Sequence, residues 1–332
     1  MTWTVPSFPV PPLDEPTLVT VEDAYLSPLA HGPIGTLAPP KRWFRGAVYD
    51  SDDRLVPSSQ RLGGVNGYNW APADPGRLSS RSRRAERLEG TWLYGGHWMQ
   101  HFGHFAIDTI TTLWPVLDVQ GLVFHKYLKR PWSIEPWQAR LLELSGYGGL
   151  PVKVVDHGNP MTVQRLLVPG RAVVPRGWAH PQAVEVWDRV ASSATGHQSP
   201  ARVFMSRTGH NERRRAEGHR SGERTTASWD QGLDGIFEQQ GFAVVRPEEL
   251  PLDEQLALVA NADTVAGGSG SALHLSAFAP SSTRVLEIGD RRSVARSVPS
   301  QQVIDAVRGH RHAFVRGDLA LAAVQSEVEA LT

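Results

Sequence analysis

The stretch TVAGGSGSAL at residues 264–273 decides the fold of this chain. It reads as a short β-branched strand that runs into a glycine-rich turn and then into a helix, which we expect over residues 271–279. Further β-branched runs lie at residues 243–245 and 284–288, and the first is followed by a helix expected over residues 253–262. This alternation is typical of parallel strands joined by crossover helices, so the sequence predicts an α/β protein.

The glycine-rich turn is a candidate anion site. A strand-to-helix turn of this kind points free backbone N–H groups and the positive end of a helix dipole at its ligand, and phosphate is the usual occupant. No Gly-Lys-Ser/Thr follows, so this is not a Walker loop, and the full GxGxxG fingerprint is absent. A serine-hydrolase G-x-S-x-G motif is excluded because Ser271 stands where that motif needs glycine. A tight turn without a ligand is the alternative.

Length and composition exclude several classes of protein. The 332 residues suffice for two domains, the formal net charge is zero and there is no cysteine. The balanced charge indicates no nucleic-acid partner, and the missing thiols exclude disulfides, Cys-ligated zinc and thiol nucleophiles. No apolar run approaches the ~18 residues of a membrane span, and residues 1–16 lack the pattern of a secretory signal. We expect a cytoplasmic protein without a transmembrane segment, and the oligomeric state stays open.

A second cluster of functional residue types lies in HWMQHFGHFAID at residues 97–108, where we expect a helix over residues 100–117. Its polar members recur at intervals of four, three and four residues: His97, His101, His104 and Asp108. Three interpretations stay open. They are a metal site of imidazoles plus a carboxylate, a catalytic His104/Asp108 pair, and buried histidines without a chemical role. The glycines before His97 favour a position for it outside the helix.

Arg207 ends a strand expected over residues 202–207. Ligands of open parallel sheets bind at the carboxyl ends of the strands, so this guanidinium and the glycine turn are suited to hold a diphosphate from two sides. A very basic segment follows, for which a solvated loop is the alternative interpretation; it holds Arg213, Arg214, Arg215, Arg220 and Arg224. The pair Asp50-x-Asp52 matches a metal-binding DxD spacing, although acidic residues at a hairpin tip are usually turn formers.

Four landmarks occur in a characteristic order. The first is His104-Phe105 with Asp108, and the second is Ser206-Arg207 before a basic loop. The third is Gly241-Phe242 followed by Leu250-Pro251-Leu252-Asp253-Glu254-Gln255, and the fourth is the glycine-rich turn before a strand that ends in Glu287. Residues 91–290 thereby resemble glycosyltransferase family 61, a capsular-polysaccharide-type domain. The family's turn usually reads Gly-x-His-Gly-Ala-x-Leu, whereas this chain has Ser269 and Ser271 at the His and Ala positions. The family's Asn-Glu pair after Arg207 is also not in clear register.

The resemblance implies a GT-B architecture, in which two Rossmann-like domains face each other across a cleft, preceded here by an N-terminal β-rich arm. Residues 1–192 would form the arm and an acceptor-side α/β domain, residues 200–298 a nucleotide-sugar-binding domain, and residues 299–332 closing C-terminal helices. The boundary falls in the small, polar segment 193–200.

The implied reaction is an inverting, metal-independent transfer of a sugar, without a cofactor. A nucleotide sugar, first of all a UDP-sugar, is the expected donor, and a glycan or other hydroxyl compound is the acceptor, in surface polysaccharide synthesis. His104 and Asp108 would supply the general base, and Glu287 would accept ribose hydroxyls. The remaining nucleotide-sugar-binding residues would be Arg207, Arg214, Gly267, Gly268, Ser269, Gly270 and Ser271. The alternatives are an inactive nucleotide- or glycan-binding relative and a His-ligated metal hydrolase.

Overall fold

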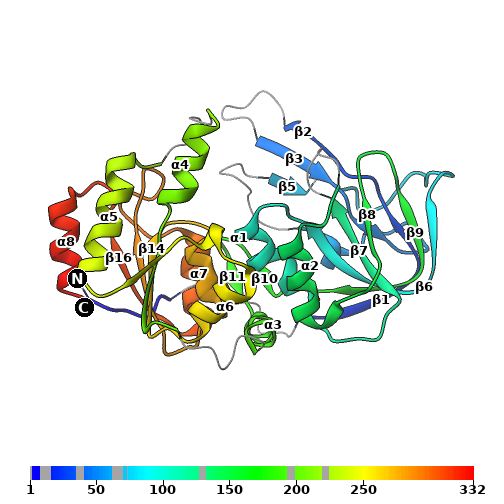
Figure 1. The fold of residues 1–332 in the computed structure, drawn as a ribbon. Helices are drawn as coiled ribbons and strands as arrows, with labels where there is room; N and C mark the ends of the chain where they lie inside the picture. Colours follow the sequence, from blue (N-terminus) through cyan, green and yellow to red (C-terminus); the bar gives the residue numbers. More distant parts are fainter. Residues whose placement is uncertain are drawn as a thin grey trace. The chain divides into compact units, whose positions relative to one another are not determined.

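The protein is described here by a computed structural model, and the chain divides into two compact units (Figure 1). Unit 1 consists of Met1–Pro9 with Trp187–Thr332, and unit 2 is Val10–Val186. Each unit combines a β-sheet with helices, so the predicted α/β class is confirmed. The structure describes residues 2–7, 16–34, 41–61, 70–72, 74–126, 132–192, 199–218 and 224–332. The predicted boundary segment 193–200 lies largely outside these residues, and Arg220 lies wholly outside them.

Unit 1 contains a five-stranded sheet in which every pairing is parallel, in the order β13-β12-β14-β15-β16. Its strands are β12 (Arg202–Met205), β13 (Ala243–Val245), β14 (Thr264–Gly268), β15 (Arg284–Ile288) and β16 (Arg311–Val315). The chain enters the sheet at the interior strand β12 and adds β13 on one side of it. It then crosses back and adds β14, β15 and β16 in turn on the other side. This is the order of a doubly wound sheet, and its switch point lies between β12 and β14. The three strands that the β-branched runs predicted are all present.

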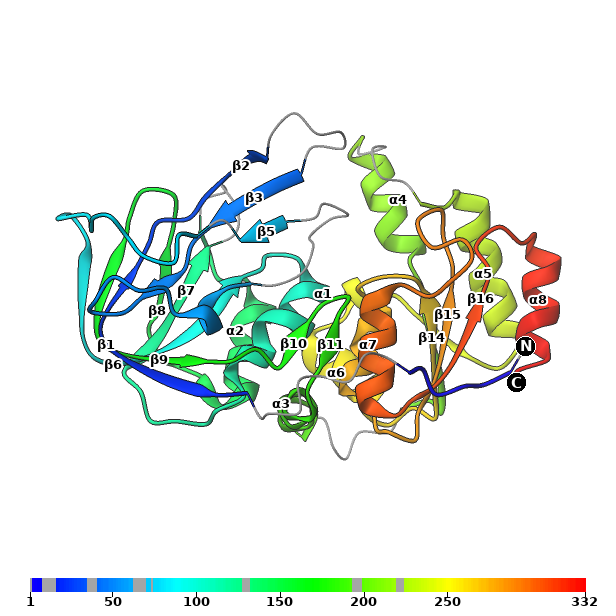
Figure 2. The same cartoon turned by 180° about the vertical axis from the view of Figure 1, so that it is seen from behind.

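Helices cover both faces of this sheet (Figures 1 and 2). On one face lie α5 (Ala227–Gln239) and α8 (Leu321–Glu329), and on the other lie α6 (Leu252–Ala260) and α7 (Pro299–Arg308). The core under α5 is apolar, with the Phe204 and Phe237 rings stacked at 4.0 Å between centroids. Helix α4 (Thr208–Ala216) follows β12 directly and carries Arg213, Arg214 and Arg215, so this part of the predicted basic loop is helical.

Two parts of unit 1 differ from the prediction. The expected helix over residues 271–279 is a short 3₁₀ helix, η7 (Leu273–Phe278), so it has no long dipole to offer the glycine turn. The closing segment holds a strand as well as two helices, because β16 lies between α7 and α8 and pairs with β15. Backbone hydrogen bonds between Thr4 and His312, of 3.0 and 2.7 Å, bring the N-terminal residues alongside β16.

Unit 2 contains a six-stranded mixed sheet in the order β4-β1-β9-β6-β7-β8. Strand β1 runs antiparallel to its two neighbours, whereas β9, β6, β7 and β8 are mutually parallel. The strands are β1 (Leu18–Leu26), β4 (Val48–Tyr49), β6 (Glu86–Trp98), β7 (Gly121–Lys126), β8 (Val152–Val155) and β9 (Met161–Pro169). The predicted N-terminal arm therefore completes this sheet, and it also forms a second sheet of β2 (Ala30–Ile34), β3 (Lys41–Arg45) and β5 (Trp70–Pro72).

Strand β6 continues through Gly95 and Gly96 to Trp98, so His97 lies outside the helix, as these glycines suggested. The pairing register with β7 shifts between Tyr94 and His97, which marks a β-bulge. Glycine is required there, because a Cβ on Gly95 would lie 1.9 Å from the ring of Phe124 and Gly96 has a φ of +79°. The bulge sets the direction in which His97 points.

The helical segment after β6 is also irregular. It consists of α1 (Phe102–His104), the π-helical turn η2 (Phe105–Thr109) and the 3₁₀ turn η3 (Ile110–Leu113), where the prediction was one α-helix over residues 100–117. His97 lies on the strand, so the four polar residues do not share one helical face. Asp108 lies inside the π turn, a feature that is frequent at functional sites.

This part of the chain also contains the 3₁₀ helix η1 (Pro57–Ser59), helix α2 (Pro136–Leu142) with the π-helical turn η4 (Glu143–Tyr147) after it, and α3 (Pro181–Ala191). The division between the units falls within α3. Helix α2 begins with a capping box between Glu135 and Gln138. In the part of the chain that the structure describes, no helix has the length and apolarity needed to cross a membrane.

Candidate functional site

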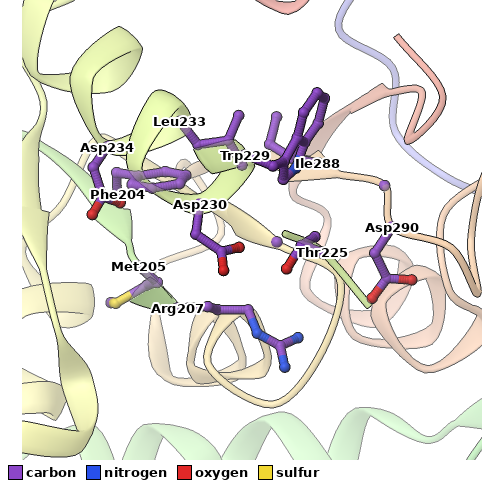
Figure 3. A pocket seen from close by; sticks show the side chains of 12 residues that line it. Phe204, Met205, Arg207, Thr225, Trp229, Asp230, Leu233, Asp234, Ile288 and Asp290 are labelled. Carbon is purple, nitrogen blue, oxygen red and sulfur yellow. The ribbon is translucent and has the colours of Figure 1, made fainter. Parts of the chain in front are cut away.

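The first candidate site lies at the carboxyl edge of the unit 1 sheet, at its switch point. Arg207 follows β12 and the glycine turn follows β14, its direct neighbour in the sheet. A pocket opens there, and Figure 3 shows the Arg207 guanidinium near the carboxylates of Asp230 and Asp290. The other lining residues are Phe204, Met205, Thr225, Trp229, Leu233, Asp234, Gly268, Ile288 and Gly289.

Three arginines converge on the turn. Nη1 of Arg207 and Nη1 of Arg224 both donate to the carbonyl oxygen of Ser269, at 3.1 and 3.3 Å. Gly270 has a φ of +140°, and a Cβ there would lie 3.1 Å from Arg224 Nη1, 3.2 Å from Arg207 Nη1 and 3.9 Å from Arg292 Nη2. We call Arg207, Arg224 and Arg292 the arginine cluster. Glycine at this position lets the guanidiniums approach the backbone.

The arginine cluster carries an excess of positive charge. Burial lowers the pKa of Arg224, and the charges of Arg207 and Arg292 lower it further. Burial also lowers the pKa of Arg207, while Asp290 opposes that shift. Asp290 Oδ2 lies 3.7 Å from Arg224 and 3.6 Å from Arg292. Three guanidiniums face this one carboxylate, so an anion that enters the site relieves their mutual repulsion.

The glycines of the turn serve close packing. A Cβ on Gly268 would lie 3.3 Å from Cδ of Arg207, and one on Gly267 would lie 3.2 Å from Cβ of Met205. Ser271 follows the turn and is half-buried. The predicted Gly267–Ser271 segment is thus brought beside Arg207, as the sequence suggested, but the charge of the site comes from arginines and not from a helix dipole.

Ser269 and Glu287 are oriented into the interior of unit 1. The Ser269 hydroxyl donates to Glu287 Oε1 at 2.5 Å and accepts from the Ser293 hydroxyl at 2.7 Å. Glu287 has no exposed surface, and it also accepts from the Ser297 hydroxyl and from the Val298 backbone N–H at 3.2 Å. Both carboxylate oxygens of Glu287 are therefore engaged within the chain. Its predicted contact with ribose hydroxyls stays a prediction.

The resemblance left the second anion-binding arginine open among Arg213, Arg214, Arg215 and Arg224, with Arg214 as the predicted site residue. The structure brings Arg224 to the turn and adds Arg292, which was not among these candidates. Arg214 lies on α4, and its charge contributes to lowering the pKa of Arg207 and Arg224. Arg292 and Asp290 follow β15, which is the neighbour of β14 in the sheet. Their position just after a parallel strand was a usable signal, because all such positions meet at one edge.

The second candidate site surrounds Asp108 in unit 2. This carboxylate is 1% exposed and is hydrogen-bonded by two buried arginines. Nε and Nη2 of Arg61 donate to Oδ2, the first at 2.8 Å, and Nη1 of Arg171 donates to Oδ1 at 2.9 Å. Burial alone would raise the pKa of Asp108, but the charges of Arg61, Arg171 and His104 outweigh it and hold the pKa below its usual value. Such a carboxylate is a poor proton acceptor.

The histidines of this region have different surroundings. His104 is partly exposed, its charge acts on Asp108, and its ring lies 5.7 Å from that of His101. His97 is buried, stacks on His125 at 5.5 Å and accepts from Arg171 Nη2 at 3.4 Å. Burial, followed by the charges of His125 and Arg171, holds the pKa of His97 well below its usual value. His97 is therefore a neutral core residue, whereas His101 is exposed and His104 is partly exposed.

The two predicted metal motifs have a structural explanation. Asp50 Oδ1 accepts from the backbone N–H groups of Asp52 and Arg54, at 2.9 and 2.8 Å, so the DxD spacing belongs to a hairpin turn. Among the described residues, no group of three or more His, Cys, Asp or Glu side chains comes together in a way that could hold a metal ion. The His97/His101/His104/Asp108 metal site is not formed.

The fold and candidate site of unit 1 define an α/β protein with an arginine-lined pocket at the switch point of a parallel sheet. A family model described as glycosyltransferase 61 matches residues 102–286, which is more than half of the 332 residues. The chain belongs to the glycosyltransferase 61 family, which confirms the resemblance seen in the sequence, and it is a glycosyltransferase with a donor and an acceptor substrate. No curated protein gives a significant match. The matched range contains His104, Asp108, Arg207 and Arg224 and ends before Asp290 and Arg292.

Proposed function

We propose that this glycosyltransferase is inverting and metal-independent, has a GT-B arrangement, and uses a nucleotide diphosphate sugar, with a UDP-sugar as first choice. The arginine cluster at the switch point carries this proposal. It supplies, from the protein itself, the positive charge that a diphosphate leaving group needs as its bond to the sugar breaks. In this arrangement unit 1 binds the donor and unit 2 binds the hydroxyl acceptor.

We propose His104 as the general base. It takes the proton of the acceptor hydroxyl while the acceptor oxygen forms a bond to the anomeric carbon of the sugar. The bond from that carbon to the diphosphate oxygen breaks, and its electron pair leaves with the diphosphate, so a single displacement inverts the anomeric centre. Asp108 is committed to Arg61 and Arg171, which supports His104 over Asp108 as the proton acceptor.

We further propose that this activity serves surface polysaccharide synthesis in the cytoplasm. The family resemblance supports the pathway, and the absence of cysteine is compatible with a reducing compartment. An inactive nucleotide-binding relative is the second candidate, favoured by Ser269 at the position where the family usually has histidine. The two candidates differ in turnover and not in donor binding.

One experiment with two variants tests the proposal. Thermal unfolding is followed with UDP, GDP, CMP and ADP and their sugars, with magnesium or with EDTA, and sugar transfer to glycan acceptors is measured in parallel. A ligand at 100 times its Kd should add about 2.7 kcal/mol of stability, with or without EDTA. Arg207→Gln should lose that stabilisation, while His104→Asn should keep it and lose roughly 10²–10⁴-fold in kcat.

Arg311→Ala is the matched control, because this exposed arginine begins β16 at the opposite edge of the same sheet. Ligand stabilisation that EDTA abolishes would contradict metal independence. Binding without transfer in wild type would favour the inactive relative, and stabilisation by no nucleotide would exclude both candidates.

A further inference from the structure

Asp290 is held firmly in place beside the arginine cluster. It is 4% exposed, and its Oδ1 accepts from the backbone N–H groups of Arg292 and Ser293, at 2.7 and 3.3 Å. The Ser293 hydroxyl in turn donates to Ser269 in the glycine turn. The carboxylate therefore has a fixed position and does not depend on the arginines to orient it.

The other oxygen of Asp290 is not used in the same way. Oδ2 is buried, accepts no hydrogen bond from any described residue and lies 3.6–3.7 Å from the nearest guanidinium nitrogens. Those guanidiniums keep N–H groups available for a ligand, since at this separation the carboxylate attracts them without a hydrogen bond. Asp230, the neighbouring carboxylate of the pocket, differs because it pairs with Asn211 at 2.9 Å and Arg215 at 3.2 Å.

The net charge of the arginine cluster with Asp290 matches the charge of the nucleotide-sugar donor better than that of the nucleoside diphosphate product. Three guanidiniums and Asp290 sum to +2. The diphosphate of a nucleotide sugar carries two negative charges, because both of its phosphates are esterified. The released nucleoside diphosphate has a terminal phosphate with a second pKa of about 6, so it carries close to one further charge at neutral pH. Without Asp290 the cluster would carry +3 and would match the product.

We propose that Asp290 is an internal counter-ion that matches the arginine cluster to the nucleotide-sugar donor and weakens its hold on the nucleoside diphosphate product. This inference rests on the proposed function. Asp290 acts through the arginines, so it is a specificity-determining residue and takes no part in bond making. It speeds product release, because the extra charge that appears on the leaving group is not fully neutralised.

Asp290→Asn provides the test, since the amide oxygen can still accept from Arg292 and Ser293 while the charge is removed. Affinities for matched pairs, UDP-glucose with UDP and GDP-mannose with GDP, are measured by titration calorimetry at pH 7.5 and low salt. For the pair that wild type binds, the ratio of the Kd of the nucleotide sugar to that of the diphosphate should rise about tenfold in the variant, as expected for one partly screened charge.

Asp263→Asn is the control for net charge. Asp263 is exposed and directly precedes β14 at the opposite edge of the sheet, so this variant should leave the ratio unchanged. Asp290→Ser provides a second variant that removes the charge and keeps a hydroxyl acceptor, and it should raise the ratio in the same direction. Thermal unfolding of each variant shows that it is folded.

The outcomes distinguish a failure of the proposed function from a failure of the counter-ion role of Asp290. If wild type binds no pair, the proposed function fails and the inference fails with it. If wild type binds a pair and the charge-free variants leave the ratio unchanged, the counter-ion role is wrong and the proposed function stands. If they weaken both ligands equally, Asp290 contacts the part that both share, such as the ribose, and the counter-ion role is again wrong.

Discussion

Two aspartates, one in each unit, lie among arginines, and they differ in how closely those arginines contact them. Both oxygens of Asp108 accept guanidinium hydrogen bonds from Arg61 and Arg171, at 2.8 and 2.9 Å. Asp290 lies 3.6–3.7 Å from Arg224 and Arg292 and faces more positive charge than it neutralises. In the first cluster both carboxylate oxygens accept guanidinium hydrogen bonds, and the two arginines exceed the carboxylate by one charge. In the second cluster the three guanidiniums exceed Asp290 by two charges, and its Oδ2 accepts no hydrogen bond from a described residue.

The largest expected effect concerns the buried ion pairs of Asp108. Asp108→Asn leaves Arg61 and Arg171 buried without their counter-ion, and removing one partner of a buried ion pair typically costs about 3–5 kcal/mol. Urea unfolding monitored by circular dichroism should show this loss in the free energy of unfolding. Asp290→Asn is the contrast and should lose far less, since its arginines remain partly solvated. Similar losses in the two variants would remove the distinction between the clusters.

A smaller effect is expected in the affinity of the arginine cluster for its ligand. Arg224→Gln removes a charge-assisted donor from the arginine cluster, and such hydrogen bonds are worth about 1.5–3 kcal/mol, or roughly 10- to 150-fold in Kd. The free energy of unfolding should stay unchanged or rise, because the variant relieves repulsion from Arg207 and Arg292.

Arg214→Gln is the matched control, since Arg214 is another of the arginines among which the resemblance left this role open, and it lies on α4. Calorimetric titration with the nucleoside diphosphate that binds wild type measures both variants. A greater loss of affinity in Arg214→Gln than in Arg224→Gln would return the second anion-binding role to Arg214.

The sequence revealed the parallel sheet of unit 1 and left much of the candidate site hidden. β-branched runs and glycine turns are local signals, so β13, β14 and β15 could be located, and with them the edge where Arg207 lies. The convergence of Arg224 and Arg292 on Gly270 depends on packing between segments far apart in the chain. No local sequence pattern predicts that these residues lie close together.

Unit 2 shows the same limit in its irregular backbone. Gly95 and Gly96 indicate that His97 lies outside the helix, but they do not reveal that β6 continues through them with a bulge beside the Phe124 ring. The apolar spacing after Gln100 predicts an α-helix, and periodicity does not reveal the π turn that contains Asp108. Arg61 and Arg171, the partners of Asp108, lie 47 and 63 residues from it in the chain, so the ion-paired carboxylate could not be inferred.

The smallest expected effect concerns pH, and it also distinguishes the units. In unit 2, burial lowers the pKa of His125 to about 4, while its backbone contact with Ser27 opposes that shift. The unfolded chain, with a histidine pKa near 6.5, binds a proton between these values that the folded unit excludes. The stabilising contribution is therefore complete above pH 6.5 and is lost as the pH falls toward 4. Lowering the pH from 7 to 5 should cost about 2 kcal/mol through this residue.

In unit 1, His312 behaves in the opposite way. Burial disfavours its charged form, but the hydrogen bond to Asp305 and the charges of Asp305 and Glu287 raise its pKa. Its contribution is complete below pH 6.5 and is lost as the pH rises through the raised value, so acidification from pH 7 to 5 does not weaken unit 1 through this residue. Urea unfolding of wild type and His125→Asn at both pH values isolates the unit 2 effect. The variant should lose about 2 kcal/mol less than wild type on acidification, and equal losses would mean that His125 does not exclude the proton.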